Sequence, residues 1–129
     1  MVDVPKNFPA LIRAEKVQKK AKAAGFDWDS ADGAFSKVYE EIEELKEAYK
    51  NKNQEEISEE FGDLLFAVVN AGRFLGVDPE LSLTDATNKF INRFSKMENL
   101  ANSKNQELDK LTLEEMDAIW SEVKKLYEQ

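Results

Sequence analysis

The sequence predicts an all-α protein, a bundle of four to five helices forming one domain over residues 1–129. Hydrophobic residues make up 42% of the chain, with only five Gly and three Pro, which is typical of an ordered globular protein. Apolar residues recur at helical spacing, and strand-like alternation is almost absent. A length of 129 residues predicts a single domain, at about 150 residues per domain.

The first half of the chain divides at glycine and asparagine residues. After a short arm over residues 1–7, we expect a helix over residues 8–24, because Gly25 suits the position just past a helix C-terminus. An aromatic loop over residues 26–30 follows. The turn Asn51-Lys52-Asn53 then separates two further helices, which we expect over residues 32–49 and 55–75.

The second half begins at Gly76, where we expect the third helix to stop. Pro79 suits the first turn of a fourth helix over residues 79–100. A polar loop over residues 102–110 leads to Thr112, which has Glu115 three residues on. This spacing is a capping box and predicts a last helix over residues 112–127.

Absent residue types exclude several kinds of chemistry. The chain has no Cys and no His, which excludes disulfides, thiolate nucleophiles, imidazole bases and His-ligated metals. Lys and Arg number 18 against 26 Asp and Glu, for a net charge of -8, so we expect no nucleic-acid partner. No apolar run approaches the roughly 20 residues of a membrane helix, and no signal peptide opens the chain. We therefore expect no membrane partner and a cytoplasmic location.

Two acidic pairs lie beside the apolar stripes of the second and third expected helices. At 100° per residue, Glu41 and Glu44 fall on one shoulder of the second helix, and Glu60 and Asp63 on one shoulder of the third. The expected apolar stripes are Val38, Ile42, Leu45 and Tyr49 in the second helix, and Ile57, Phe61, Leu64, Leu65 and Val68 in the third. Four neighbouring acids point away from the stripes: Glu40, Glu43, Glu47 and Glu59.

The heights of the acidic pairs along the expected hairpin match. Glu44 and Glu60 are each eight residues from Lys52, and Glu41 and Asp63 are each eleven. We therefore expect four carboxylates to converge beside the core. Clustered anions repel one another unless a cation binds, and oxygen-only ligands favour Mg²⁺, Mn²⁺ or Ca²⁺. The alternative is a pair of ordinary solvated helix faces, which acidic hairpins often present.

These residues resemble the EExxE…ExxD signature of MazG-type nucleoside triphosphate pyrophosphohydrolases, in Glu40-Glu41-x-x-Glu44 and Glu60-x-x-Asp63. The resemblance extends over nearly the whole chain and is closest to the catalytic, C-terminal type of MazG domain. Its other segments are Lys16-Val17-Gln18-Lys19, Gly25-Phe26-Asp27-Trp28, Gly62-Asp63-Leu64-Leu65-Phe66, Lys89-Phe90-x-x-Arg93-Phe94 and Trp120-x-x-x-Lys124.

The resemblance implies an all-α homodimer that hydrolyses NTPs or dNTPs to nucleoside monophosphate and pyrophosphate with Mg²⁺, or with Mn²⁺ as a substitute. It implies that Glu41, Glu44, Glu60 and Asp63 are metal ligands, and that Glu40 and Glu59 are outer acids that help to orient water. It further implies that a nucleotide binds near Lys16, Lys19, Lys89, Arg93, Trp120 and Lys124, with Lys89 and Arg93 also acting in catalysis.

Other interpretations remain open from the residues. Lys89 and Arg93 also suit ordinary exposed helix charges, and Trp120 suits a core anchor beside Met116, Ile119 and Val123. A narrower dUTP- or dCTP-type or modified-nucleotide enzyme would use the same metal site, with a base pocket built from the first helix and the loop over residues 26–28. A nucleotide-binding or interaction module without turnover is the non-enzymatic alternative, and a sensor of (p)ppGpp-like ligands is another.

One pattern points to a partner surface on the third helix. Phe66, Val69 and Phe74 lie off its main apolar stripe. A helix that is apolar on more than one face is either central in its bundle or at an interface. This pattern adds to the expectation of a homodimer.

Overall fold

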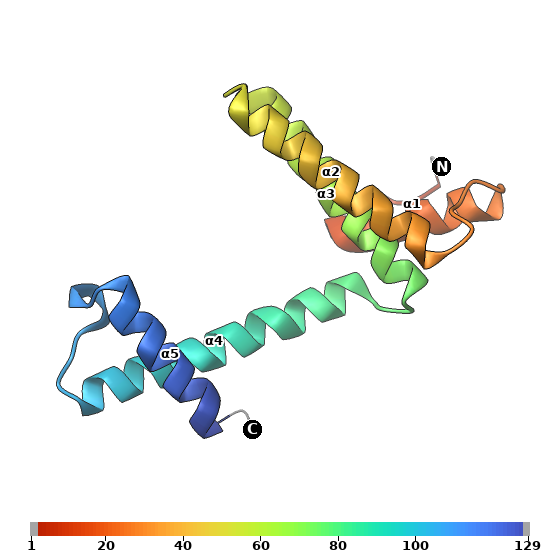
Figure 1. Ribbon diagram of the computed structural model, residues 1–129. Coiled ribbons are helices and arrows are strands. Elements are labelled where there is room, and N and C mark those ends of the chain that lie inside the picture. The colour runs from red at the N-terminus through yellow and green to blue at the C-terminus, as the bar shows by residue number, and fades with distance from the viewer. Residues whose placement is uncertain (1–2, 128–129) are drawn as a thin grey trace. The chain divides into compact units, whose positions relative to one another are not determined.

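The computed structural model describes residues 3–127 and is all-helical over that range (Figure 1). Its elements are α1 (Ala10–Ala23), α2 (Ala31–Lys50), α3 (Gln54–Phe74), α4 (Pro79–Ser103), the short 3-10 helix η1 (Leu108–Lys110) and α5 (Leu113–Tyr127). The expected helix order is confirmed. The main departure is that α4 continues three residues beyond its expected end.

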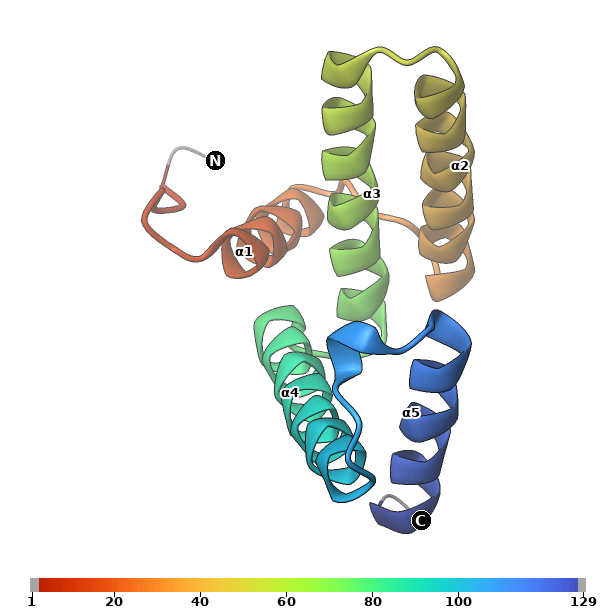
Figure 2. The same cartoon turned by 90° about the vertical axis from the view of Figure 1, so that its left-hand side faces the viewer.

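Two compact units make up the chain, Met1–Ser82 and Leu83–Gln129. In the first unit, α2 and α3 form an antiparallel hairpin and α1 packs against α3 (Figure 2). The buried residues of this hairpin include Ala34, Ala48, Ala67 and Ala71.

Local signals in the sequence explain where the helices of the first unit start and stop. Gly25 (φ +94°) and Gly76 (φ +70°) end α1 and α3 in the left-handed conformation that favours glycine. Asn53 caps α3, because its side-chain oxygen accepts hydrogen bonds from the backbone N–H of Glu55 and Glu56 at 3.1 and 3.2 Å. The turn between α2 and α3 is therefore set by its own residues.

The second unit packs α5 against the C-terminal half of α4. Its buried core is Met97, Ala101, Ile119 and Val123. Asn105 (φ +57°) takes the left-handed position after α4, and the backbone N–H of Gln106 donates to the Ala101 carbonyl at 2.9 Å. Asparagine tolerates this conformation better than most residues, so it serves here in place of glycine.

The expected apolar stripes of α2 and α3 differ from the observed burial. Tyr49, Phe61, Leu65 and Val68 are exposed, whereas Glu41 is only 4% exposed. Four other members of the expected stripes, Val38, Leu45, Ile57 and Leu64, are partly buried. The apolar stripe that the sequence indicates is thus split between the interior and the surface of this chain.

Candidate metal centre and adjoining pocket

The turn at Lys52 places acidic residues of α2 opposite acidic residues of α3. Lys52 adopts φ +55°, and the two helices run antiparallel from it (Figure 2). Carboxylate oxygens of Glu41, Glu60 and Asp63 all lie within 4.8 Å of one another. Glu44 is exposed and is not part of this group, but it lies close enough to Glu60 to raise the pKa of that carboxyl group. The structure therefore brings together three of the four expected ligands and leaves the fourth, Glu44, beside them.

Two buried oxygens in this cluster have no hydrogen-bond partner. They are Oε2 of Glu41 and Oε2 of Glu60. The other oxygen of Glu41, Oε1, accepts from the Lys37 ammonium at 2.9 Å. A buried carboxylate oxygen without a donor is costly, and a hard divalent cation is the partner that carboxylate oxygens suit. The donor set therefore fits Mg²⁺ or Mn²⁺.

Protonation of Glu60 also reflects this crowding. Burial raises the pKa of Glu60 to about 7, with further contributions from the hydrogen bond to Glu44 and from the charges of Glu44, Asp63 and Glu41. The pKa of Lys37 is raised chiefly by its hydrogen bond to Glu41. Without a cation, the pKa of Glu60 therefore lies near neutral pH and not near its ordinary value of 4.5.

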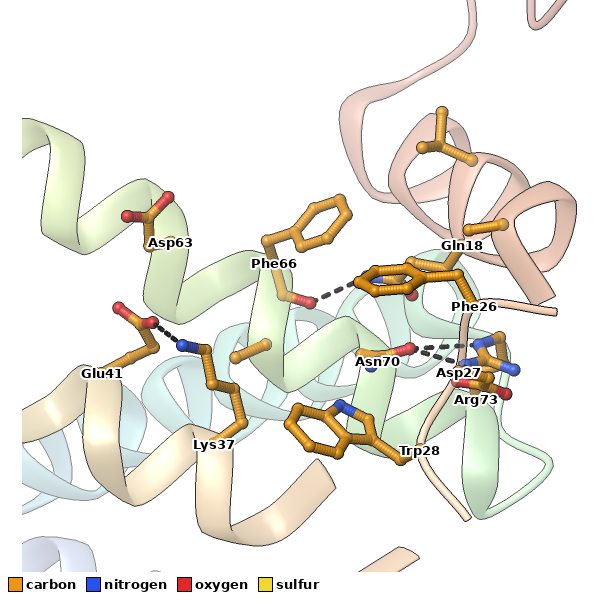
Figure 3. Close-up of a pocket in the computed structure, with 13 residues that line it drawn as sticks. Gln18, Phe26, Asp27, Trp28, Lys37, Glu41, Asp63, Phe66, Asn70 and Arg73 are labelled. Carbon is orange, nitrogen blue, oxygen red and sulfur yellow. Dashed lines mark hydrogen bonds and ion pairs between the residues drawn. The ribbon is translucent and has the colours of Figure 1, made fainter. Parts of the chain in front are cut away.

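A pocket of about 830 Å³ extends from the carboxylates to the loop after α1. Glu41, Asp63 and Lys37 lie at one end of the pocket, and Phe26, Trp28 and Arg73 at the other (Figure 3). Its lining also includes Val17, Gln18, Ala21, Asp27, Phe66, Ala67 and Asn70. The size suits a small organic ligand.

Trp28 is held in this pocket by a glycine. A Cβ atom built on Gly33 would lie 3.1 Å from Cε3 of Trp28, so the indole ring packs directly on the backbone at the start of α2. Phe26, by contrast, is 82% exposed. One aromatic ring of the loop is therefore seated against α2, and the other is free to meet a ligand.

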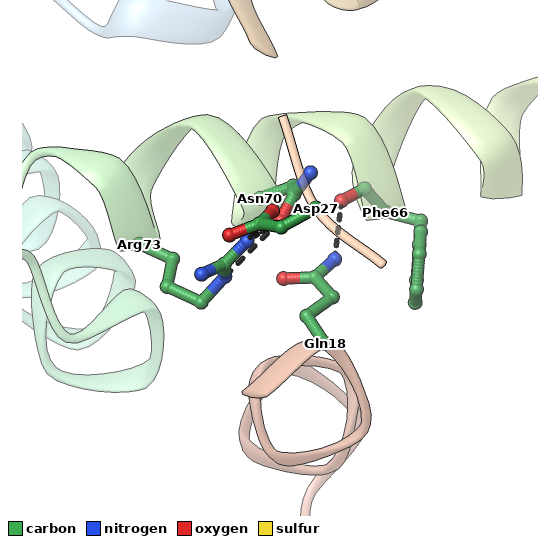
Figure 4. A network of polar contacts seen from close by, with 5 residues as sticks. All are labelled: Gln18, Asp27, Phe66, Asn70 and Arg73. Atoms are coloured by element: carbon green, nitrogen blue, oxygen red, sulfur yellow. Dashed lines mark hydrogen bonds and ion pairs between the residues drawn. The ribbon is translucent and has the colours of Figure 1, made fainter. Parts of the chain in front are cut away.

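A polar network joins the aromatic loop to α3 (Figure 4). Nη2 of Arg73 donates to Asp27 Oδ1 at 2.5 Å and to Asn70 Oδ1 at 2.8 Å, and its Nε donates to the same Asn70 oxygen at 3.2 Å. The Arg73 guanidinium lowers the pKa of Asp27. Beside this network, Nε2 of Gln18 donates to the Phe66 carbonyl at 2.9 Å.

The other predicted residues of the first unit lie outside the cluster and the pocket lining. Glu40 and Glu59 are exposed, and Glu40 contacts Lys37 at 3.4 Å. Lys16 lies over the Phe8 ring at 5.1 Å, and Lys19 pairs with Glu15 at 3.0 Å. Their neighbours Val17 and Gln18, rather than these two lysines, line the pocket.

The four remaining predicted residues belong to the second unit. Lys89 and Lys124 are exposed. The Arg93 guanidinium lies over the Trp120 ring at 5.2 Å, and the ring of Phe90 is 5.5 Å from that of Trp120. Trp120 also packs, partly buried, against the core of this unit. Its indole ring is thus both a core anchor and the platform for Arg93.

Sequence reasoning missed several polar residues of the pocket. Gln18, Asn70 and Arg73 were not among the expected site residues, and neither were Asp27 and Lys37. A signal was present for two of them: Gln18 follows Ala14 by four residues on the inner face of α1, and Asn70 lies beside the buried Ala67 and Ala71. A polar residue on an otherwise apolar inner face marks a cavity or a hydrogen-bond partner.

A comparison with protein families matches residues 31–98 to the MazG nucleotide pyrophosphohydrolase domain. This chain belongs to the MazG family. The matched segment contains α2, α3 and most of α4, and so includes the clustered Glu41, Glu60 and Asp63 as well as Glu44.

Individual relatives agree with this assignment. The chain is 47% identical over 116 residues to the nucleoside triphosphate pyrophosphohydrolase/pyrophosphatase MazG of Thermotoga maritima. The matched residues cover 90% of this chain and 44% of that protein. The chain is 40% identical over 125 residues to the nucleoside triphosphate pyrophosphohydrolase of Escherichia coli K12, covering 95% and 48% respectively. The uncharacterized protein YabN of Bacillus subtilis is 43% identical over 122 residues, covering 94% and 25%.

The chain therefore spans less than half the length of these relatives. Among the described residues, no helix has both the length and the apolar character needed to cross a membrane.

Proposed function

We propose that this chain hydrolyses nucleoside triphosphates to a nucleoside monophosphate and pyrophosphate, with Mg²⁺ held by Glu41, Glu44, Glu60 and Asp63. The observation that carries the proposal is the pair of buried, unpartnered oxygens, Oε2 of Glu41 and Oε2 of Glu60, in a cluster of carboxylates. The family and the names of the relatives support the reaction class. Mn²⁺ has the same preference for oxygen ligands and is the expected substitute.

The residues around the cluster are suited to different parts of this reaction. Bound Mg²⁺ would supply a Lewis acid, lower the pKa of a bound water and neutralise developing charge. Glu40 and Glu59 are exposed acids next to the ligand positions, and we assign to them the orientation of the attacking water and the acceptance of its proton.

The triphosphate needs positive charge in addition to the metal. Lys89, Arg93 and Lys124 carry that charge, and Lys16 and Lys19 add to it on α1. We assign to the first three the stabilisation of phosphate oxygens. The platform that Trp120 offers to Arg93 would orient the guanidinium for this task.

The pocket beside the carboxylates is where we place the nucleoside. It is lined by residues of α1, of the aromatic loop, of α2 and of α3, and Glu41 and Asp63 are among its lining residues. A nucleotide whose phosphates meet the carboxylates would therefore extend its base toward Trp28 and Phe26, which can stack on it. The proposed biological form is a homodimer.

A carboxamide substitution tests the metal site. Glu60→Gln keeps the shape of the side chain but removes its charge, so we expect pyrophosphate release to fall by at least about 100-fold, as large losses are typical when an essential group is removed. Release is measured from a panel of NTPs and dNTPs with Mg²⁺ and with EDTA.

The matched control is Glu47→Gln, at an exposed position on α2 outside the cluster, which should retain full activity. Helicity by circular dichroism should be unchanged in both variants. Full activity of Glu60→Gln would contradict the proposed site. Nucleotide binding without turnover in the unmodified chain would favour a binding module instead.

A further inference from the structure

Two side-chain amides in the pocket have their orientation fixed by neighbours that can play only one role in a hydrogen bond. Arg73 is a donor only, so the atom of Asn70 that it contacts must be the oxygen, and the Nδ2 group points elsewhere. The Phe66 carbonyl is an acceptor only, so the atom of Gln18 that faces it must be Nε2. Oε1 of Gln18 is thereby fixed as the remaining acceptor.

The remaining atom of each amide has no partner among the described residues. Oε1 of Gln18 is buried and accepts no hydrogen bond, and Gln18 as a whole is only 5% exposed. Nδ2 of Asn70 makes none of the hydrogen bonds in which this residue takes part. Both residues line the pocket, and Figure 3 shows Asn70 between Trp28 and Arg73. An unsatisfied buried acceptor is costly, and a ligand N–H would relieve that cost.

The surroundings of these amides suit a flat aromatic ligand. Phe26, Trp28 and Phe66 line the same pocket, and aromatic side chains bind bases by stacking. Each nucleobase offers, on its Watson–Crick edge, at least one N–H donor beside at least one acceptor. Proteins commonly recognise an unpaired base through this edge, combined with stacking.

We propose that Asn70 and Gln18 read the edge of the nucleobase, with Asn70 Nδ2 donating to a base acceptor and Gln18 Oε1 accepting from a base N–H. This inference rests on the nucleotide substrate of the proposed function. Arg73 is a positioning residue here, because it holds the Asn70 oxygen and ties the loop that carries Trp28 to α3 through Asp27.

Binding of nucleoside monophosphates tests the inference without any need for hydrolysis. Asn70→Asp keeps an oxygen for Arg73 and the shape of the side chain, but it replaces the pocket donor by an acceptor. The probes are AMP, GMP, CMP and UMP, with ribose 5-phosphate as the ligand that lacks a base. Dissociation constants are measured by NMR titration with Mg²⁺ present, for the unmodified chain, for Asn70→Asp, and for Asn51→Asp as the charge control on an exposed residue.

The expected result is a changed order of preference. In Asn70→Asp, the ratio of dissociation constants between the best and the worst base should shift by about tenfold or more, because a polar site discriminates strongly against a ligand that mispairs with it. The dissociation constant of ribose 5-phosphate should be the same in Asn70→Asp as in the charge control Asn51→Asp. A second variant, Gln18→Met, removes the acceptor. It should raise the dissociation constants of the four nucleoside monophosphates but not that of ribose 5-phosphate.

Two outcomes would overturn the inference: unchanged ratios among the four bases, or an equal change for all four bases and ribose 5-phosphate. Pyrophosphate release from the corresponding triphosphates is measured in parallel. An unchanged order of base preference in Asn70→Asp, with normal hydrolysis by the unmodified chain, would refute this inference alone. A changed order of base preference in Asn70→Asp, with no hydrolysis by the unmodified chain, would refute the proposed function alone.

Discussion

Glu60 is the residue at which the electrostatics of the carboxylate cluster can be measured. Its pKa is about 7 in the folded chain, against an ordinary value of 4.5, with burial as the largest cause. A carboxyl group whose pKa is raised by folding binds more protons in the folded than in the unfolded chain. The stabilisation is then fully present below about pH 4.5 and is lost as the pH rises through about 7.

We therefore predict that, in EDTA, the free energy of unfolding of this chain decreases between about pH 5 and about pH 7.5, relative to that of Glu60→Gln. Urea denaturation at several pH values measures the difference between the two proteins. Saturating Mg²⁺ should remove the dependence, because a bound cation favours the ionised carboxylate. Equal pH profiles in EDTA for the two proteins would show that Glu60 is not the group that titrates.

At the scale of single residues, the sequence predicted the acidic cluster better than it predicted the pocket. Glu41 and Asp63 could be placed from helical spacing and from equal distances to Lys52, since both rules depend on local geometry alone. Asn70 and Gln18 could not, because their roles arise from tertiary neighbours. The partner of Asn70 is an arginine that in turn holds Asp27 in a different element.

The start of α5 is the element whose stability rests most clearly on one local motif. The Thr112 hydroxyl accepts from the Glu115 backbone N–H at 3.1 Å, and the Glu115 carboxylate accepts from the Thr112 backbone N–H at 3.0 Å. These reciprocal bonds confirm the capping box expected from the sequence. The hydrogen bonds with Thr112 also lower the pKa of Glu115.

We predict that Thr112→Ala lowers the free energy of unfolding by about 1 kcal/mol, the usual effect of losing an N-cap side chain. Urea denaturation at neutral pH measures this change. Thr87→Ala, at an exposed position inside α4, is the matched control and should be neutral or slightly stabilising, because Ala favours a helix interior. A loss in the control as large as that in Thr112→Ala would contradict the capping role.

At the scale of helices, the sequence predicted well where each helix begins and ends, but it did not predict which faces of the helices are buried. Gly25, Gly76 and Pro79 mark boundaries because their backbone preferences act locally. The buried faces of α2 and α3 depend instead on tertiary neighbours, and their fully buried apolar residues are mostly alanines. Of the large side chains that periodicity assigned to the core, Tyr49, Phe61, Leu65 and Val68 are exposed.

Many large apolar side chains are exposed among the described residues, and three of them share one face of α3. Phe61, Leu65 and Val68 lie on one face of α3 and are 51%, 45% and 49% exposed. This surface differs from the one suggested by the sequence, since Val69 is only 4% exposed. Contiguous exposed apolar surface of this kind usually marks an interaction site, and a second copy of this chain is the partner we propose.

Analytical ultracentrifugation tests the dimer. We predict that the chain sediments as a species of twice its 14.7 kDa mass, and that Leu65→Glu shifts it to the monomer because a buried unpaired charge is costly. Ser36→Glu introduces the same charge at an exposed polar position of α2, away from this face of α3, and should leave the dimer intact. Sedimentation of the unmodified chain only at 14.7 kDa would refute the homodimer.

The turn at Lys52 has a consequence for how sequences of this kind can vary. Surface loops ordinarily tolerate insertions and deletions, but this loop sets which residue of α2 faces which residue of α3. One residue inserted into the helices between Glu41 and the turn, or between the turn and Asp63, would move a carboxylate by about 1.5 Å along its helix and about 100° around it, relative to the carboxylates of the other helix. The number of residues between Glu41 and Asp63 is therefore a structural requirement of the carboxylate cluster, in addition to the identity of its acids.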